Sequence, residues 1–126
     1  MQQWSQYELE ESLCESLAIN QFKNPTEVQS KSLFYLQQHI DMVIAAKTGQ
    51  GKTLCFGIPI LDLLIKKIQK AEAVMSDSEG EEEKEEPKKK KEIFTSAKAL
   101  IMSPTRELAI QIRDMITAVI PMEYQD

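Results

Sequence analysis

A short loop with two glycines carries the residue types with the clearest chemistry in this sequence. It reads Ala46-Lys47-Thr48-Gly49-Gln50-Gly51-Lys52-Thr53, after apolar residues 42–45. Phosphate groups need several backbone N–H donors that converge on one point, and Gly49 and Gly51 let the backbone come that close. Lys52 then places a positive charge beside the outer phosphates, and the Thr53 hydroxyl is positioned to ligate Mg²⁺ at the start of a helix. The spacing predicts a phosphate-binding loop, or P-loop (residues 46–53).

One position departs from the general P-loop pattern. The strict spacing asks for glycine where this chain has Ala46, so a small residue is kept but the glycine is not. The competing interpretation is a glycine-rich turn between a strand and a helix, in which Gly-Lys-Thr occurs by chance. The apolar run before the loop and the helix-forming residues after it favour a P-loop, because the motif requires that context.

The first element expected before the loop is an amphipathic helix. Leu9, Leu13 and Leu17 recur every four residues within residues 8–19, which is the period of one helix face. Pro25 then interrupts regular structure, because the residue before a proline is kept out of the helical region. A loop therefore separates this helix from the next one.

A second helix, a strand and a long helix follow in order. Thr26 and Gln29 fit a capping box, in which each side chain satisfies a backbone N–H of the other residue. Residues 41–46 are too short for a helix and lack a period of 3.6, so they are expected to form a buried strand. Residues 52 to about 70 suit a long helix with a kink at Pro59, where a donor is lost.

The last elements expected are a buried strand at residues 99–102 and a helix that begins at Pro104 and Thr105 and ends at Pro121. The apolar face of that helix would hold Leu108, Ile112, Met115, Ile116 and Val119. Two strands joined by a helix form a βαβ unit with parallel strands. A parallel sheet normally has both faces covered and more strands than two, so the α/β unit looks incomplete.

Residues 76–92 differ in composition from the rest of the chain. Residues 77–92 hold eight acidic and five basic residues, and four of the five lysines directly follow Pro87. Such a segment cannot bury enough apolar surface to offset its ordering entropy, so we expect a disordered, solvated linker. Two further interpretations stay open, namely phosphorylation of Ser76 and Ser78, each with a glutamate three residues on, and a nuclear-import signal in the lysines.

The composition of these 126 residues excludes several classes of protein. No apolar run reaches the roughly 18 residues of a membrane span, so we expect a soluble intracellular protein without a membrane partner. Cys14 and Cys55 stand alone in different predicted helices, which supports neither disulfides nor a zinc site. His39, the one histidine, has no companion ligand and is given no role. The net charge of −5 lies partly in residues 77–92, so a local basic patch remains compatible with nucleic-acid binding.

Three motifs in register resemble those of the DEAD-box RNA helicases. Residues 22–29 are similar to the Q motif of that family, residues 46–53 to its P-loop with alanine first, and residues 104–111 to its Pro-Thr-Arg-Glu-Leu-Ala motif. The resemblance covers the whole chain except the charged segment. It implies a RecA-like P-loop NTPase fold, with a parallel sheet flanked by helices, present here as an incomplete N-terminal portion.

The resemblance also implies roles for individual residues. Gln29 would hydrogen-bond the adenine edge, Phe22 would pack against the base beside the upstream aromatic Trp4, and Thr26 would support the P-loop. The capping box of Thr26 and Gln29 competes with this interpretation. ATP and Mg²⁺ would bind along Ala46, Lys47, Thr48, Gly49, Gln50, Gly51, Lys52 and Thr53, with Lys52 and Thr53 as the catalytic residues. RNA phosphates would meet Pro104, Thr105 and Arg106, for which the alternative is a helix start with surface charges.

Four positions depart mildly from the family pattern. Gln21 stands where glycine is usual, Val28 where isoleucine is, and Lys47 and Gln50 where glutamine and serine are commoner. None removes a contact of the loop backbone, but Lys47 adds a charge near the phosphates. We therefore expect nucleotide affinity to differ from that of other family members.

The Asp-Glu-Ala-Asp motif of the family does not occur in these residues, so we expect the N-terminal part of an ATP-dependent RNA helicase that is inactive alone. The expected parts are residues 1–75 with the Q motif and P-loop, the insertion 76–92, and residues 93–126 with the RNA-contacting helix. The insertion resembles that of nucleolar helicases in large-ribosomal-subunit assembly, which suggests pre-ribosomal partners and a nuclear or nucleolar, otherwise cytoplasmic, location. The alternatives are a non-catalytic nucleotide- or RNA-binding module and an unrelated P-loop ATPase.

Overall fold

The computed structural model describes residues 3–76 and 97–125, and within them all regular structure is helical. Of the expected disordered insertion, residues 76–92, only Ser76 is described, and the rest lies outside the described residues. The described helices are η1 (Trp4–Gln6), α1 (Glu11–Ile19), α2 (Glu27–Leu36), α3 (Lys52–Ser76), α5 (Arg106–Ala118) and η2 (Met122–Tyr124). α3 starts where the P-loop was expected to lead into a helix, so the loop-to-helix part of the prediction is confirmed.

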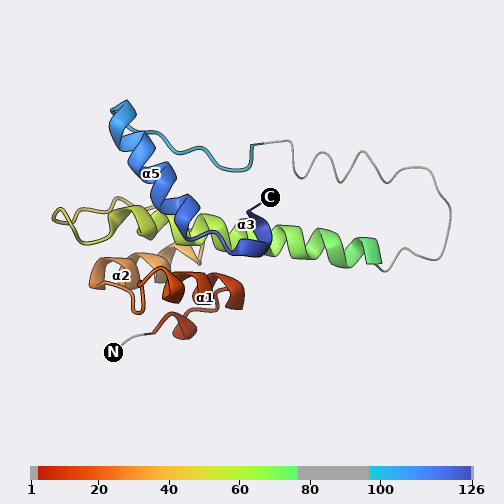
Figure 1. Cartoon of the computed structure of the whole chain (residues 1–126). Coiled ribbons are helices and arrows are strands. Elements are labelled where there is room, and N and C mark those ends of the chain that lie inside the picture. The colour runs from red at the N-terminus through yellow and green to blue at the C-terminus, as the bar shows by residue number, and fades with distance from the viewer. Residues whose placement is uncertain (1–2, 77–96, 126) are drawn as a thin grey trace.

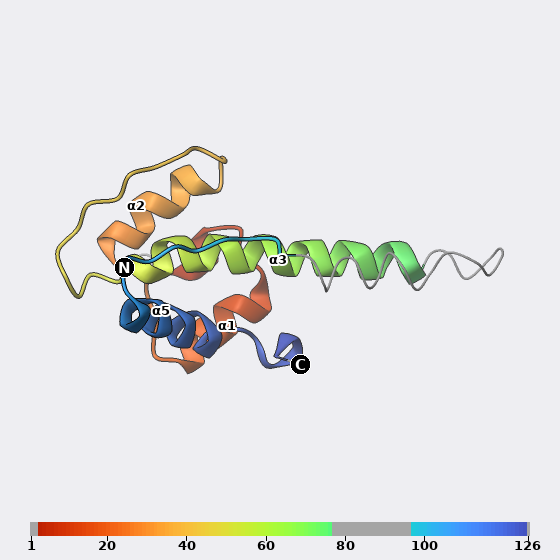
Figure 2. The ribbon, with the colours of Figure 1, turned by 90° about the horizontal axis from the view of Figure 1, so that it is seen from above.

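The long helix α3 is the centre of the arrangement. α2 packs along one side of it and α5 crosses it, while α1 lies below its N-terminal half (Figures 1 and 2). The helix runs through Pro59 as one element and continues to Ser76, past the expected end near residue 70. Its C-terminal half extends beyond the other helices (Figure 1). The packed part of the molecule therefore surrounds the half of α3 that begins at the P-loop.

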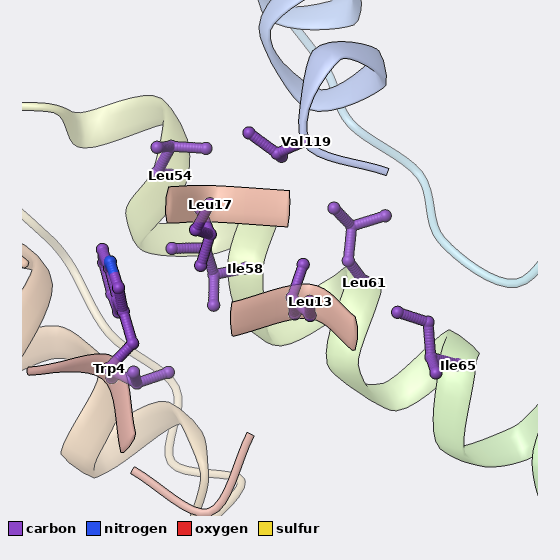
Figure 3. Close-up of a cluster of buried hydrophobic side chains, with 9 residues drawn as sticks. Trp4, Leu13, Leu17, Leu54, Ile58, Leu61, Ile65 and Val119 are labelled. Carbon is purple, nitrogen blue, oxygen red and sulfur yellow. The ribbon is translucent and has the colours of Figure 1, made fainter. Parts of the chain in front are cut away.

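The core joins all of these helices around α3. Figure 3 shows Leu54, Ile58, Leu61 and Ile65 pointing from one face of α3 toward α1 and the end of α5. The buried apolar set comprises Trp4, Leu13, Leu17, Leu33, Leu54, Ile58, Leu61, Ile65 and Val119. This is the stripe at positions i, i+4, i+7 and i+11 of α3 that a half-buried helix requires. Burial of this stripe fixes where the P-loop end of α3 lies.

The two expected strands are not formed in the described residues. Residues 41–46 and 99–102 run without strand pairing, and Val43 and Leu100 are 99% and 84% exposed. Figures 1 and 2 show the two segments on different sides of α3. A parallel strand is held by ladder bonds to its neighbours, and each segment lacks a neighbour here. The prediction of a buried parallel sheet is therefore not confirmed by the described residues.

One helix boundary needs correction, and one amphipathic helix is only partly covered. The first helix begins at Glu11 and not at residue 8, because Glu10, its N-cap, has a non-helical ψ of 137°. On α5 the apolar face is largely open, with Leu108 and Met115 39% and 38% exposed, and only Val119, at its C-cap, is buried. The packing of α5 on α3 and the core involves Ile116 and Val119, so its apolar face is covered mainly at its C-terminal end.

The backbone conformation at Gln21 shows why glycine is usual in the family at this position. It follows α1 with φ +68°, while Phe22 N–H donates to Leu17 O at 2.9 Å, which is the closing bond of a helix C-terminus. A positive φ is accessible to glycine but costs other residues about 1–2 kcal/mol. The glycine usual in the family at this position is thus the residue that the backbone conformation favours.

We predict that Gln21→Gly stabilises the chain. The relieved strain exceeds the added chain entropy of glycine, which leaves a gain of about 0.5–1 kcal/mol in the free energy of unfolding. Urea unfolding followed by circular dichroism measures it. Gln37→Gly is the matched control, because Gln37 ends α2 at φ −64° and gains nothing from glycine. Equal or lower stability for Gln21→Gly than for the unsubstituted chain would contradict the prediction.

The cysteines are free thiols, Cys55 buried and Cys14 half-buried. Burial, and then the nearby carboxylate of Asp62, raise the pKa of the Cys14 thiol, so it stays protonated more readily than a free cysteine. No group of three or more metal-ligating side chains occurs among the described residues. None of the helices in this part of the chain is long and apolar enough to cross a membrane.

Candidate nucleotide-binding site

The backbone of the P-loop has the conformation that its glycines predict. Gly49 and Gly51 have φ +85° and +78°, which other residues rarely adopt. The N–H groups from Gly49 to Thr53 donate no hydrogen bond to the rest of the described chain. They belong to the loop and to the first turn of α3, whose amides have no partner in a preceding turn. The loop thus presents several free donors at the positive end of a helix.

Two residues of the Q motif (residues 22–29) hold the P-loop from behind. The Thr26 hydroxyl donates to Gln50 O at 2.9 Å, and Gln29 Nε2 donates to Gly51 O at 3.0 Å. A Cβ atom added to Gly51 would overlap Gln29 Nε2, so the contact also requires glycine there. The N-terminal end of α2 and the carbonyl side of the loop are therefore packed together.

The capping box of α2 is present in the same place. Gln29 Oε1 accepts from Thr26 N–H at 2.9 Å, and the Thr26 hydroxyl accepts from Gln29 N–H at 3.3 Å. Gln29 is 4% exposed, and each end of its carboxamide has a partner in the chain. The carboxamide keeps one further N–H and one further lone pair. Capping and adenine recognition are therefore compatible, which the sequence alone did not reveal.

The Lys52 side chain lies across the loop. Its ammonium donates to Ala46 O at 2.7 Å, from the first turn of α3 to the first residue of the loop. Thr53 is half-buried beside it, whereas Lys47 and Thr48 are exposed. A carbonyl oxygen is a weaker partner for an ammonium than a phosphate oxygen. Lys52 is thus held near the loop in a contact that a phosphate can displace.

The two aromatic residues expected at the base have different surroundings. Phe22 is half-buried and packs against the core. Trp4 is 3% exposed within the core, and its indole N–H donates to the carbonyl of Phe22. Trp4 therefore does not offer a ring face to a ligand here. It contacts the first residue of the Q motif instead.

The expected RNA-binding residues lie at the start of α5. Pro104, Thr105 and Arg106 are all exposed. The Thr105 hydroxyl caps the helix by accepting from Leu108 N–H at 3.2 Å, as the alternative interpretation of a helix start proposed. Both views place the N-terminus of α5 at the same end of the molecule as the N-terminus of α3 (Figures 1 and 2). Two helix N-termini with exposed basic residues thus share one end of the protein.

Sequence reasoning missed one buried polar group. Asp62 on α3 is 6% exposed, with its carboxylate bonded to Glu10 N–H at 2.8 Å and to Lys66 Nζ at 2.7 Å. The signal available was an acidic residue on the apolar stripe of a helix, four residues before a lysine. Such a residue is rarely buried without partners, so its position alone predicts a specific contact.

The loop between residues 46 and 53, its two glycines at positive φ and the Lys-Thr pair at the start of α3 are the features of a P-loop nucleotide-binding protein. A more particular assignment follows from comparison with known proteins. The family model described as DEAD/DEAH box helicase matches residues 26–124. The chain therefore belongs to the DEAD/DEAH box helicase family, whose fold is RecA-like.

The relatives of this chain carry helicase names. It is 37% identical over 118 residues to the ATP-dependent RNA helicase mak-5 of Neurospora crassa. The matched region covers 94% of this chain and 13% of that protein. It is 39% identical over 121 residues to the ATP-dependent rRNA helicase SPB4 of Scheffersomyces stipitis, and this match covers 96% of this chain and 18% of that protein. DEAD-box ATP-dependent RNA helicase 13 of Oryza sativa is 37% identical over 116 residues, and this match covers 88% of this chain and 13% of that protein. The chain thus spans less than a fifth of the length of these relatives.

Proposed function

We propose that this chain forms the ATP-binding part of an ATP-dependent RNA helicase, an enzyme whose ATP hydrolysis is stimulated by RNA. The observation that carries the proposal is the pair of hydrogen bonds from Thr26 and Gln29 to the carbonyls of Gln50 and Gly51. They place the residues proposed to bind adenine against those proposed to bind phosphate. One nucleotide can therefore contact both motifs.

The P-loop fits a magnesium nucleotide. Its free N–H groups would surround the phosphates, and Lys52 would exchange the Ala46 carbonyl for a phosphate oxygen. The Thr53 hydroxyl would hold Mg²⁺ together with phosphate oxygens, and the ion would neutralise charge on the phosphates. A side chain at Gly51 would displace Gln29. The P-loop is therefore shaped to bind phosphate through its backbone. The catalytic side chains that we propose in it are Lys52 and Thr53.

On the base side, we propose that Phe22 packs against adenine and that the remaining N–H of Gln29 donates to it. Trp4 contributes by holding the carbonyl of Phe22. Because the carboxamide of Gln29 is fixed at both ends, its free N–H has a defined direction. A preset direction favours one base over another, since a mismatched base leaves a buried donor unpaired.

RNA would bind at the start of α5. Thr105 and Arg106 are exposed there, and phosphate contacts of this kind fix the position of a strand without reading its sequence. The shared end of α3 and α5 supports the proposal that ATP and RNA lie near each other (Figure 1). Unwinding would need the second RecA-like domain and the Asp-Glu-Ala-Asp motif, which we assign to the remainder of the whole protein.

The pathway is proposed from the relatives. One of them is named an rRNA helicase, which fits a role on pre-ribosomal particles and a nucleolar location. We further propose the division of the chain into residues 1–75 and 93–126 of one RecA-like domain, interrupted by the insertion 76–92. The family match that begins at residue 26 and ends at residue 124 supports one domain across that insertion.

We predict that Gln29→Ala relaxes the preference for adenine. The whole protein should lose at least about tenfold in its ratio of ATP to GTP hydrolysis, because a hydrogen bond in a buried site carries about that discrimination. Gln29→Glu is the matched control for capping, since glutamate also completes a capping box but has no N–H to donate. Both variants should relax the preference. A ratio unchanged in Gln29→Glu would reduce Gln29 to a helix cap.

A further inference from the structure

The buried carboxylate of Asp62 lies midway along α3, far from the P-loop residues at its start. A charged group that is 6% exposed is costly unless its oxygens are satisfied, and both are. Oδ1 accepts from Glu10 N–H at 2.8 Å, and Oδ2 accepts from Lys66 Nζ at 2.7 Å. Lys66 Nζ donates in addition to Glu8 O at 2.8 Å. Asp62 and Lys66 thus hold the backbone before α1 at two points.

This backbone belongs to a segment, residues 4–10, that we call the N-terminal strap. Its far end is Trp4, which is 3% exposed and whose indole N–H donates to Phe22 O. The strap therefore has one anchor on α3 and the other on the first residue of the Q motif. A third contact strengthens the α3 anchor, because Gln69 Nε2 donates to Glu10 Oε2 at 3.1 Å.

The strap therefore connects the two halves of the nucleotide site through a second route. The direct route joins Gln29 to Gly51 at the start of α3. The indirect route runs from α3 through Asp62 to Glu10, along the strap to Trp4, and across to Phe22. Phe22 has no hydrogen bond of its own to the P-loop among the described contacts. Two bonds hold its backbone, from the Phe22 N–H to Leu17 O and from the Trp4 indole to Phe22 O, and the strap controls the second of them.

We infer that Asp62 is a positioning residue for the base: through the Glu10 N–H and the strap it holds Trp4, and through Trp4 it fixes Phe22 relative to the P-loop. The inference rests on the proposed function in one respect, that Phe22 contacts the base. Asp62 touches neither nucleotide nor Mg²⁺ in this account. Its effect is therefore expected on recognition of the base and not on binding of the phosphates.

The test uses the 126-residue chain with three variants. Asp62→Ala removes both bonds, Asp62→Asn keeps an oxygen that can accept from Glu10 N–H, and Lys67→Ala is the control, because Lys67 is an exposed neighbour on α3. Trp4 is the only tryptophan, so its fluorescence reports the strap directly. Acrylamide quenching without nucleotide is measured first. Affinities for Mg·ATP and for Mg·tripolyphosphate, which has phosphates but no base, are then measured by calorimetry.

Asp62→Ala should raise the acrylamide quenching constant of Trp4 about twofold or more and weaken Mg·ATP about tenfold, the scale of one bond to a charged group. Its affinity for Mg·tripolyphosphate should stay within about twofold. Asp62→Asn should recover most of the ATP affinity, and Lys67→Ala should change nothing. An equal loss for both ligands, or unchanged Trp4 quenching in Asp62→Ala, would overturn the inference. Absence of Mg·ATP binding by the unsubstituted chain would instead contradict the proposed function, and the quenching result would then still decide whether Asp62 holds the strap.

Discussion

If the proposed function is right, replacing Lys52 with alanine in the whole protein should lower RNA-stimulated ATP hydrolysis by about a hundredfold or more. This is the scale seen when one preorganised charge-stabilising donor is removed from an active site. The Lys52 ammonium lies over the loop, 2.7 Å from Ala46 O, and is the cation that we propose to interact with the outer phosphates. That charge grows in the transition state, so the loss should appear mainly in kcat. Colorimetric phosphate release with saturating RNA measures it.

A second lysine of α3 controls for a general charge effect. Lys67→Ala removes an exposed positive charge from the same helix, away from the loop, and should leave hydrolysis within about twofold. The folding of both variants is checked by thermal unfolding. If Lys52→Ala retained hydrolysis close to that of the unsubstituted protein, the loop would not be the catalytic phosphate site and the assignment of Lys52 would be wrong.

Gly51→Ala should weaken Mg·ATP more than about tenfold and destabilise the chain by about 2–3 kcal/mol, from the strain of a positive φ plus the loss of a hydrogen bond. Gly51 has φ +78°, and a Cβ there would overlap the Gln29 amide nitrogen. Gln29 must then give up either Gly51 O or its cap on Thr26. Calorimetric titration and urea unfolding measure the two effects.

Gly49→Ala is the matched control, because Gly49 has a similar φ of +85° but nothing within 4 Å of an added Cβ. Its free energy of unfolding should fall only by the strain of the positive φ, about 1–2 kcal/mol. Combining Gly51→Ala with Gln29→Ala should remove the extra cost of Gly51→Ala over Gly49→Ala, since the overlapping atom is gone. Equal destabilisation by Gly49→Ala and Gly51→Ala with Gln29 in place would contradict the close packing of Gln29 on the loop.

The helices were predictable because local patterns determine them. The apolar spacing of Leu13 and Leu17, the capping box at Thr26 and the Lys52 helix start all depend on residues within one or two turns. The two predicted strands are not confirmed in the described residues, since a strand is stable only with neighbours that are distant in sequence. Residues 99–102 thus have the composition of a buried strand, yet Leu100 and Met102 are each 84% exposed.

For the candidate site, spacing identified the groups but not their partners. The pattern Thr26-x-x-Gln29 indicated either a cap or an adenine contact, whereas the geometry lets Gln29 cap α2 and bond to Gly51 at once. Trp4 was expected beside the base from resemblance, but an isolated aromatic does not reveal which surface it will pack on. The contact of Asp62 with Glu10 joins residues 52 positions apart, beyond the reach of any local pattern.

The most direct test of the central claim, that one magnesium nucleotide bridges the Q motif and the P-loop, is a ¹⁵N NMR titration of the 126-residue chain with Mg·ATP. The backbone amides of Gly49, Gly51 and Thr53 and the side-chain amide of Gln29 should shift together with one saturation curve, because a single ligand contacts all four. Mg·GTP should shift the backbone amides with little effect on the Gln29 side chain. Shifts confined to the P-loop on addition of Mg·ATP, with the Gln29 side chain unchanged, would contradict the account.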